Sequence, residues 1–127
     1  MKLLLDTHAF LWFVAGDEKL SPAARTSIEQ GETRILSVAS LWEMAIKASI
    51  GKLRLDLPFE ELVERHVRPN GIELLGIEIR HVSRVAALPF LHRDPFDRLL
   101  VAQALGEGLV VVSADESFDA YGVARVW

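Results

Sequence analysis

Short apolar runs alternate along this chain with stretches in which apolar residues recur every three or four positions. The runs are apolar at consecutive positions, which is typical of strands covered on both faces. The longer stretches have the period of helices, and several carry Pro at the first helical position or Gly after the last. We expect strands at residues 2–5, 33–36, 72–75 and 109–112, with an edge strand at 124–126. We expect helices at residues 7–14, 22–30, 38–50, 58–67, 78–88 and 95–107.

Strands that alternate with helices predict an α/β fold, a sandwich around a mostly parallel sheet. The length of 127 residues fits one domain, and no linker or repeat divides it, so we expect a single domain at residues 1–127. Half of the residues are hydrophobic, which excludes a disordered chain. Ligands of such sheets bind outside the carboxyl ends of the strands, and a site is expected at that edge.

Charge and cysteine content exclude several classes of protein. The 14 Lys and Arg residues face 18 Asp and Glu, a net charge of −4, whereas a general nucleic-acid binder is basic. The absence of cysteine excludes disulfides and thiolate chemistry and fits a reducing compartment. No apolar run approaches the ~20 residues of a membrane span, and the N-terminal run ends at Asp6. We therefore expect a cytoplasmic protein with no membrane segment.

Five acidic residues fall where a site is expected. Asp6 follows the first strand directly, and Asp115 comes just after the fourth. Glu43 lies in the first turns of the helix after the second strand, and Asp94 and Asp97 bracket the start of the helix before the fourth. Carboxylates that converge repel one another, so the cluster needs a cation. Oxygen ligands favour a hard divalent ion, with Mg²⁺ or Mn²⁺ expected.

The first two of these acids also have structural interpretations. Asp6 could cap the helix that follows, although Thr7 is an equally good cap and would leave Asp6 free. Glu43 completes a capping box with Ser40 and could pair with Lys47, four residues on. For Glu43, periodicity alone leaves the site and the structural interpretation equally open.

The remaining acids separate more cleanly. Asp94 is placed as the N-cap of its helix, whereas Asp97 shares a face with the buried apolar stripe and is the better metal ligand. Asp94 remains a further candidate for contact with the site. Asp115 is either a solvated loop acid or a site residue, in a segment where Ser113 and Glu116 form a possible capping box.

Basic, histidine and aromatic side chains complete the candidates. Arg93 and Arg98 flank the acids and are expected to contact phosphates, whereas Arg80 and Arg84 fit solvated helix faces. The histidines lack zinc-site spacing, and His92 is interpreted as positioning Asp94. Aromatic residues at helical spacing are expected to pack in the core or at a dimer surface rather than stack on bases. These are Phe10, Trp12 and Trp42. Other basic residues follow the Glu43 helix and could contribute to the same positive rim for phosphates, namely Lys47, Lys52 and Arg54.

Five segments together resemble PIN domains of the VapC toxin type. They are KLLLDTH at 2–8, SLWEMAIK at 40–47, GKL at 51–53, HRDPFDR at 92–98 and VSAD at 112–115. The similarity runs in order from Leu3 to Trp127, and the 92–98 segment is its most specific part. The resemblance implies a three-layer α/β/α nuclease with a central parallel sheet. It implies an Mg²⁺- or Mn²⁺-dependent ribonuclease, the toxin of a type II toxin–antitoxin pair.

The resemblance also implies roles for individual residues. It assigns an acidic quartet to Asp6, Glu43, Asp97 and Asp115, with Asp94 close by, and it places Thr7 and Ser113 in the pocket lining. Ser113 stands where Thr is commoner in the family. The implied partners are RNA as substrate, a cognate antitoxin whose tail covers the acids, and a second copy of the chain in a homodimer.

The expected chemistry is hydrolysis of an RNA phosphodiester. Asp6, Asp97 and Asp115 would hold one or two ions, and Glu43 would bind or orient the attacking water. One alternative is a phosphoacceptor receiver domain, which the lone Asp6 and the missing lysine after the fourth strand disfavour. Another is a PIN-fold binding module without catalysis, which the intact quartet disfavours.

Overall fold

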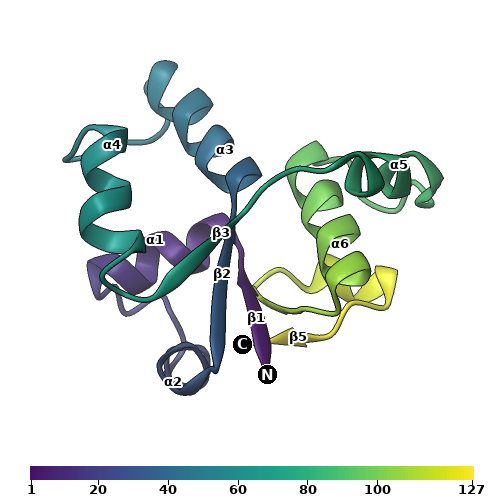
Figure 1. Cartoon of the computed structure of the whole chain (residues 1–127), viewed down its shortest axis with the longest axis horizontal. Helices are drawn as coiled ribbons and strands as arrows, with labels where there is room; N and C mark the ends of the chain where they lie inside the picture. Colours follow the sequence, from purple (N-terminus) through teal and green to yellow (C-terminus); the bar gives the residue numbers. More distant parts are fainter.

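A five-stranded parallel sheet forms the centre of the protein (Figure 1). The computed structural model describes residues 1–127. The strands lie in the order β3-β2-β1-β4-β5, and every neighbouring pair is parallel. Their bounds are β1 Lys2–Leu5, β2 Thr33–Ser37, β3 Ile72–Leu75, β4 Val110–Val112 and β5 Arg125–Val126. The expected strands are confirmed, and the expected edge strand pairs in parallel with β4.

Helices cover both faces of this sheet, as the sequence predicts (Figure 1). Their bounds are α1 Thr7–Ala15, α2 Pro22–Gln30, α3 Val38–Ser49, α4 Phe59–Leu62, α5 Ile79–Ala87 and α6 Pro95–Glu107. The helix expected at 58–67 is α4 continued by a π-helical turn, Val63–Val67. A 3-10 helix at Glu116–Tyr121 was not expected from the sequence. No helix combines the length and the apolar character needed to cross a membrane.

Alternating side chains of the strands build two separate cores. Leu3 and Leu5 of β1 point to the face covered by α1, where they pack with Phe10. Leu4 points to the opposite face and packs with Leu100 of α6. All three leucines of β1 are fully buried, which explains why this strand is apolar at consecutive positions. The fold is therefore a three-layer α/β/α sandwich, in agreement with the apolar pattern of the strand.

The strand order creates a crevice beside the carboxyl end of β1. From β1 the chain passes through α1 and α2 to β2 on one side, whereas β4 lies on the other side of β1. The connection into β4 runs through α6, which packs on the opposite face of the sheet from α1. Neighbouring connections that diverge to opposite faces leave a crevice at the strand ends. This crevice holds the candidate site.

Candidate active site

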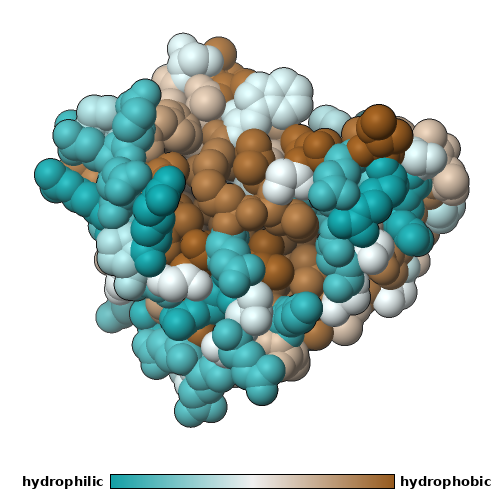
Figure 2. Space-filling model, in the orientation of Figure 1, coloured by the Kyte–Doolittle hydropathy of each residue, from teal (hydrophilic) through white to brown (hydrophobic).

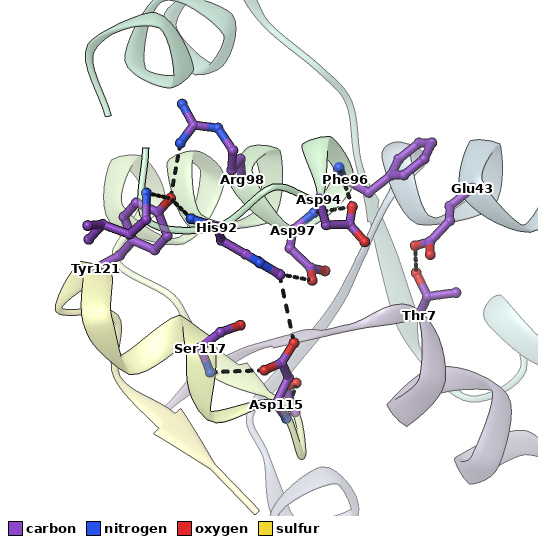
Figure 3. Close-up of polar contacts among 12 residues, drawn as sticks. Thr7, Glu43, His92, Asp94, Phe96, Asp97, Arg98, Asp115, Ser117 and Tyr121 are labelled. Carbon is purple, nitrogen blue, oxygen red and sulfur yellow. Dashed lines mark hydrogen bonds and ion pairs between the residues drawn. The ribbon is translucent and has the colours of Figure 1, made fainter. Parts of the chain in front are cut away.

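All five predicted acids line one cavity at the carboxyl edge of the sheet. The cavity has a volume of about 220 Å³ and no hydrophobic residue in its lining. Figure 3 shows how residues from α3, α6 and the segment after β4 meet there. Besides the acids Asp6, Glu43, Asp94, Asp97 and Asp115, the lining contains Thr7, His8, Lys47 and His92. Convergence of distant carboxylates is therefore a property of this fold.

Asp6 both caps α1 and contributes to the cavity. Its Oδ1 accepts a hydrogen bond of 2.7 Å from the backbone N–H of Ala9, which makes Asp6 the N-cap of the helix. The alternative in which Thr7 caps the helix is wrong, because Thr7 is the first helical residue and its hydroxyl serves Glu43. The cap fixes one oxygen of Asp6 and leaves the second without a backbone bond. A helix cap and a cation ligand are thus compatible in one side chain.

Glu43 lies buried in α3 with a donor on each of its oxygens. The hydroxyl of Thr7 donates to Oε1 at 2.6 Å, and the ammonium of Lys47 donates to Oε2 at 2.7 Å. The expected capping box with Ser40 is wrong, because α3 begins one turn earlier and Ser37 caps it. The pair with Lys47 is confirmed. These two donors orient a carboxylate that is only 6% exposed.

The start of α6 brings two acids and a histidine together. Asp94 caps the helix, since its Oδ1 accepts from the N–H groups of Phe96 and Asp97, as the sequence predicts. His92 Nε2 lies 2.9 Å from Asp97 Oδ2 and 3.9 Å from Asp115 Oδ2 (Figure 3). Ligand atoms of His92, Asp97 and Asp115 all lie within 4.8 Å of one another. His92 thus contacts Asp97 and not Asp94, which corrects the sequence interpretation.

The segment after β4 places Asp115 at the mouth of the cavity. The hydroxyl of the buried Ser113 accepts from the N–H of Asp115, and Asp115 Oδ1 accepts from the N–H of Ser117. Asp115 is therefore the cap of the 3-10 helix, and the capping box of Ser113 with Glu116 does not form. These two hydrogen bonds, both within five residues of sequence, fix the position of Asp115.

Burial and crowding shift the pKa values of the acids. Burial raises the pKa of Asp6, although contacts with Ser113 and the Ala9 amide oppose it. Burial also raises the pKa of Asp97 from 3.8 to about 6, against the opposing bond from His92. For Asp115 burial is outweighed by the bonds from Ser117, and the pKa is lowered. The positive charge near Asp6 and Asp97 is therefore too small to offset the effect of burial on their ionised forms.

The raised pKa of Asp97 predicts a measurable effect on stability. Above its pKa the ionised carboxylate opposes folding, so the free energy of unfolding falls as the pH rises from about 4 to 6. Asp97→Asn is expected to stabilise the metal-free protein at about pH 7.5 by about 1–3 kcal/mol. Urea unfolding in EDTA should show this gain at about pH 7.5 and a much smaller one at about pH 4. An equal gain at both values would contradict the assignment.

The two arginines expected at a phosphate-binding rim lie elsewhere. Arg98 is only 8% exposed, and its guanidinium donates to the carbonyls of Pro89 and Val85 and to the hydroxyl of Tyr121. It anchors the segment that carries His92 rather than facing the cavity, which corrects its expected role. Arg93 is exposed beside His92 on the outer surface and does not line the acidic cavity.

Comparison with known proteins decides the family. The PIN domain model matches residues 3–124, nearly the whole chain. The chain belongs to the PIN domain family. Ribonuclease VapC22 of Mycobacterium tuberculosis is 32% identical over 117 residues, which cover 89% of this chain and 86% of that protein. The resemblance to VapC-type PIN domains is thereby confirmed, and the receiver-domain alternative is set aside.

Solved structures share the fold of this PIN domain. VapBC2 from Rickettsia felis, bound to a promoter DNA fragment, superposes with a TM-score of 0.73 at 13% identity, covering 99% of this chain and 98% of that chain. VapBC from Salmonella typhimurium, bound to DNA, gives 0.68 at 20% identity, covering 99% and 97%. FitAcB from Neisseria gonorrhoeae gives 0.66 at 20% identity, covering 98% and 96%. At these identities the likeness establishes the architecture.

The donor set of this PIN domain fits a hard divalent cation. Asp6, Asp94 and Asp115 each commit one oxygen to a helix N-terminus, which fixes the carboxylate and leaves the other oxygen without a backbone bond. Oxygen ligands of this kind suit Mg²⁺ or Mn²⁺. Within the cavity only Lys47 and His92 pair with the five acids. A divalent ion would supply the missing positive charge.

Sequence reasoning missed three lining residues. Lys47 was weighed as a partner of Glu43 and as one of several basic residues that could seat phosphates, His8 was left without a role, and His92 was assigned to the wrong acid. The signal that could have found His92 is its place at the start of HRDPFDR, the most specific part of the resemblance. Its contact with Asp97 spans an irregular segment, where neither helical nor strand periodicity applies.

Proposed function

We propose that this chain is an Mg²⁺- or Mn²⁺-dependent endoribonuclease and the toxin of a type II toxin–antitoxin pair. We further propose that residues 1–127 form a single PIN domain. The observation that carries the proposal is the convergence of five carboxylates in one polar cavity of about 220 Å³. Membership of the PIN family and similarity to a protein named a ribonuclease support the same activity. A PIN-fold module without catalysis would not need so many acids at one point.

In this proposal the acids have separate tasks. Asp6, Asp97 and Asp115 would hold the ion, with Asp94 as a further candidate in the same lining. Glu43 orients the attacking water, because Thr7 and Lys47 already occupy one position on each of its oxygens and hold it still. The bound ion would lower the pKa of water and offset negative charge in the transition state. His92 fixes the rotamer of Asp97 through its bond to Oδ2.

The reaction is an in-line displacement at phosphorus. The water oxygen gives up a proton as it forms a bond to phosphorus, the bond from phosphorus to the 3′ oxygen breaks, and the leaving 3′ oxygen takes up a proton, so that one water is consumed for each bond cleaved. The products carry a 5′-phosphate and a 3′-hydroxyl, so the 2′-hydroxyl of the RNA is not the nucleophile.

The direct experiment incubates the purified chain with a mixed RNA pool and Mn²⁺, and then captures new ends by ligation that requires a 5′-phosphate. We expect new 5′-phosphate ends with Mn²⁺ and none with EDTA. Folded protein that yields no new ends at any Mn²⁺ concentration would overturn the activity. Ends that carry a 5′-hydroxyl would instead overturn the proposed bond cleavage.

We also propose a small antitoxin protein as partner. The architectures that match this chain come from structures named as VapBC and FitAB complexes. An arginine from such a partner would fit a cavity with five acids and would compete with a metal ion. Co-purification of the chain with the product of a neighbouring small gene tests this partner.

One face of the protein exposes a group of large apolar side chains, and we propose that a second copy of the chain covers it. Figure 2 shows hydrophobic side chains gathered in the middle of this face, between α3 and α5, where Figure 1 draws β3 and the chain that follows it. Ile79 is 89% exposed and Trp42 is 58% exposed, far more than large apolar residues of a monomer surface normally show in a group. Others on these elements and the following segment are Val38, Ile46, Leu74, Val82, Phe90 and Leu91. We propose that this face forms a homodimer.

Ile79→Glu is expected to convert the dimer into a monomer, because it buries a carboxylate in an apolar interface. Size-exclusion chromatography with light scattering gives the mass directly. Ala23→Glu, on the exposed part of α2, is the matched control and should remain dimeric. A wild-type chain that is monomeric at every concentration, or a dimer unaffected by Ile79→Glu, would refute this interface.

A further inference from the structure

A second cavity adjoins the acidic one and has a different character. It has a volume of about 510 Å³, within the range of pockets that bind small organic ligands. It lies between α1 and the chain that leaves the end of α3, on one side of the sheet (Figure 1). Thr7, His8 and Lys47 line both cavities, so the two share a wall. A ligand longer than one cavity could therefore extend from the acids into this second cavity.

One wall of the second cavity is aromatic. His8 and Trp12 stand one turn apart on α1, with ring centroids 5.4 Å apart and planes tilted by 37°. Trp127 also packs against Trp12, with ring centroids 5.8 Å apart and planes tilted by 58°. This contact holds the indole in place before any ligand arrives, which lowers the entropic cost of stacking on it. A preformed aromatic surface beside a nuclease site is suited to a nucleobase.

The opposite wall carries free positive charge. Lys52 and Arg54 line the cavity, both are exposed, and neither forms an ion pair in the structure. The segment that bears them is fixed, because the N–H groups of Lys52 and Leu53 donate to the carbonyl of Lys47. Two unpaired cations on an acidic chain complement phosphate rather than an uncharged peptide.

We propose that this cavity seats one nucleotide of the RNA next to the cleaved phosphodiester, a proposal that rests on the ribonuclease function above. The base stacks on His8 and Trp12, and Lys52 and Arg54 contact the flanking phosphate. Because the two cavities share a wall, a nucleotide held here places the adjoining phosphodiester over the acids. Trp12 packs against the core, as the sequence pattern predicts, and in this proposal the part of its ring that remains exposed also faces substrate.

RNA binding in EDTA tests the subsite without cleavage. The probe is a labelled single-stranded RNA, and fluorescence anisotropy gives its affinity at several salt concentrations. The double variant Lys52→Ala/Arg54→Ala is expected to lose about tenfold in affinity, and its dependence on salt should fall by about one unit of slope. The matched control is Lys19→Ala/Arg68→Ala, which removes the same charge outside the cavity and should stay within about twofold of wild type.

The aromatic wall is tested by two substitutions that differ in stacking. Trp12→Leu keeps apolar packing, and Trp12→Phe keeps an aromatic face. We expect a loss of about tenfold in RNA affinity for Trp12→Leu and a much smaller loss for Trp12→Phe, with unfolding followed in parallel. If both variants lose the same RNA affinity, and this loss parallels a loss of folding stability, the stacking role is overturned.

The remaining outcomes separate the subsite from the activity. Equal affinities for the Lys52/Arg54 pair and its control would overturn the subsite even if wild type cleaves RNA. A tenfold loss would support the subsite even if no cleavage is found. Unchanged RNA affinity, together with weaker binding of an antitoxin peptide, would assign the cavity to a protein segment and overturn the proposal.

Discussion

Asp97→Asn is expected to reduce Mn²⁺-dependent RNA cleavage by about a thousandfold or more, an increase of roughly 4 kcal/mol in the activation barrier. The amide keeps the shape of the side chain but removes the negative charge that would hold the ion. It also weakens the hydrogen bond between His92 Nε2 and the side chain at position 97. Initial rates on a fluorogenic RNA measure the loss, and circular dichroism checks that the fold is intact.

Asp56→Asn is the matched control for this prediction, because Asp56 is an exposed acid outside the cavity. Its cleavage rate should stay within about twofold of wild type. Asp6→Asn should lose activity as Asp97→Asn does. Full activity in purified Asp97→Asn would falsify the assignment of Asp97 as a ligand.

Arg98→Ala is expected to destabilise the protein by about 2–4 kcal/mol. Removing the guanidinium leaves the carbonyls of Pro89 and Val85 and the hydroxyl of Tyr121 without this donor, and it empties the space of a side chain that is only 8% exposed. It also removes the cation that lies 5.0 Å from the centre of the Phe90 ring. Urea unfolding measures the change.

Arg93→Ala, at the exposed neighbour of the same segment, should change stability by less than about 0.5 kcal/mol. The pair of variants separates an anchoring role for Arg98 from the phosphate contact that its position in the sequence suggests. Wild-type stability together with weakened RNA binding in Arg98→Ala would contradict the anchoring role and would support a phosphate contact for Arg98.

Strands and helices were predictable because each reflects a local pattern. Leu3, Leu4 and Leu5 are apolar at consecutive positions since both faces of β1 are buried, and that pattern is readable without any partner strand. The cap and proline at Asp94-Pro95 likewise fix the start of α6 locally. The gathering of acids also follows from the element order, because a helix that directly follows a parallel strand, and a helix such as α6 that leads back into one, both begin at the carboxyl edge of the sheet.

Roles that depend on long-range contacts were not predictable. Arg98 lies among the acids in the sequence, yet its guanidinium reaches Tyr121, 23 residues on, and is buried there. His92 meets Asp115 across the site because the irregular segment 88–94 folds back, and no periodicity describes such a segment. Asp6 shows a further limit, since cap and ligand were treated as alternatives although its two oxygens allow both.

The buried acids also have a thermodynamic consequence. Asp6 and Asp97 carry raised pKa values because burial opposes their ionised forms, so the metal-free site lowers the stability of the fold near neutral pH. An ion that binds only the folded state returns this stability. Functional sites commonly lower the stability of a protein below the value that other residues at the same positions would give.

Anomalous diffraction from crystals soaked in MnCl₂ tests the central claim most directly, because it locates the ion without reference to activity. We predict a single region of manganese density bounded by Asp6, Asp97 and Asp115, which disappears in Asp97→Asn crystals. The chain offers a second group of possible ligands at Glu78, His81 and Glu107, whose two glutamates Arg80 already bridges. Manganese at that group alone, or no density among the five acids, would contradict the account.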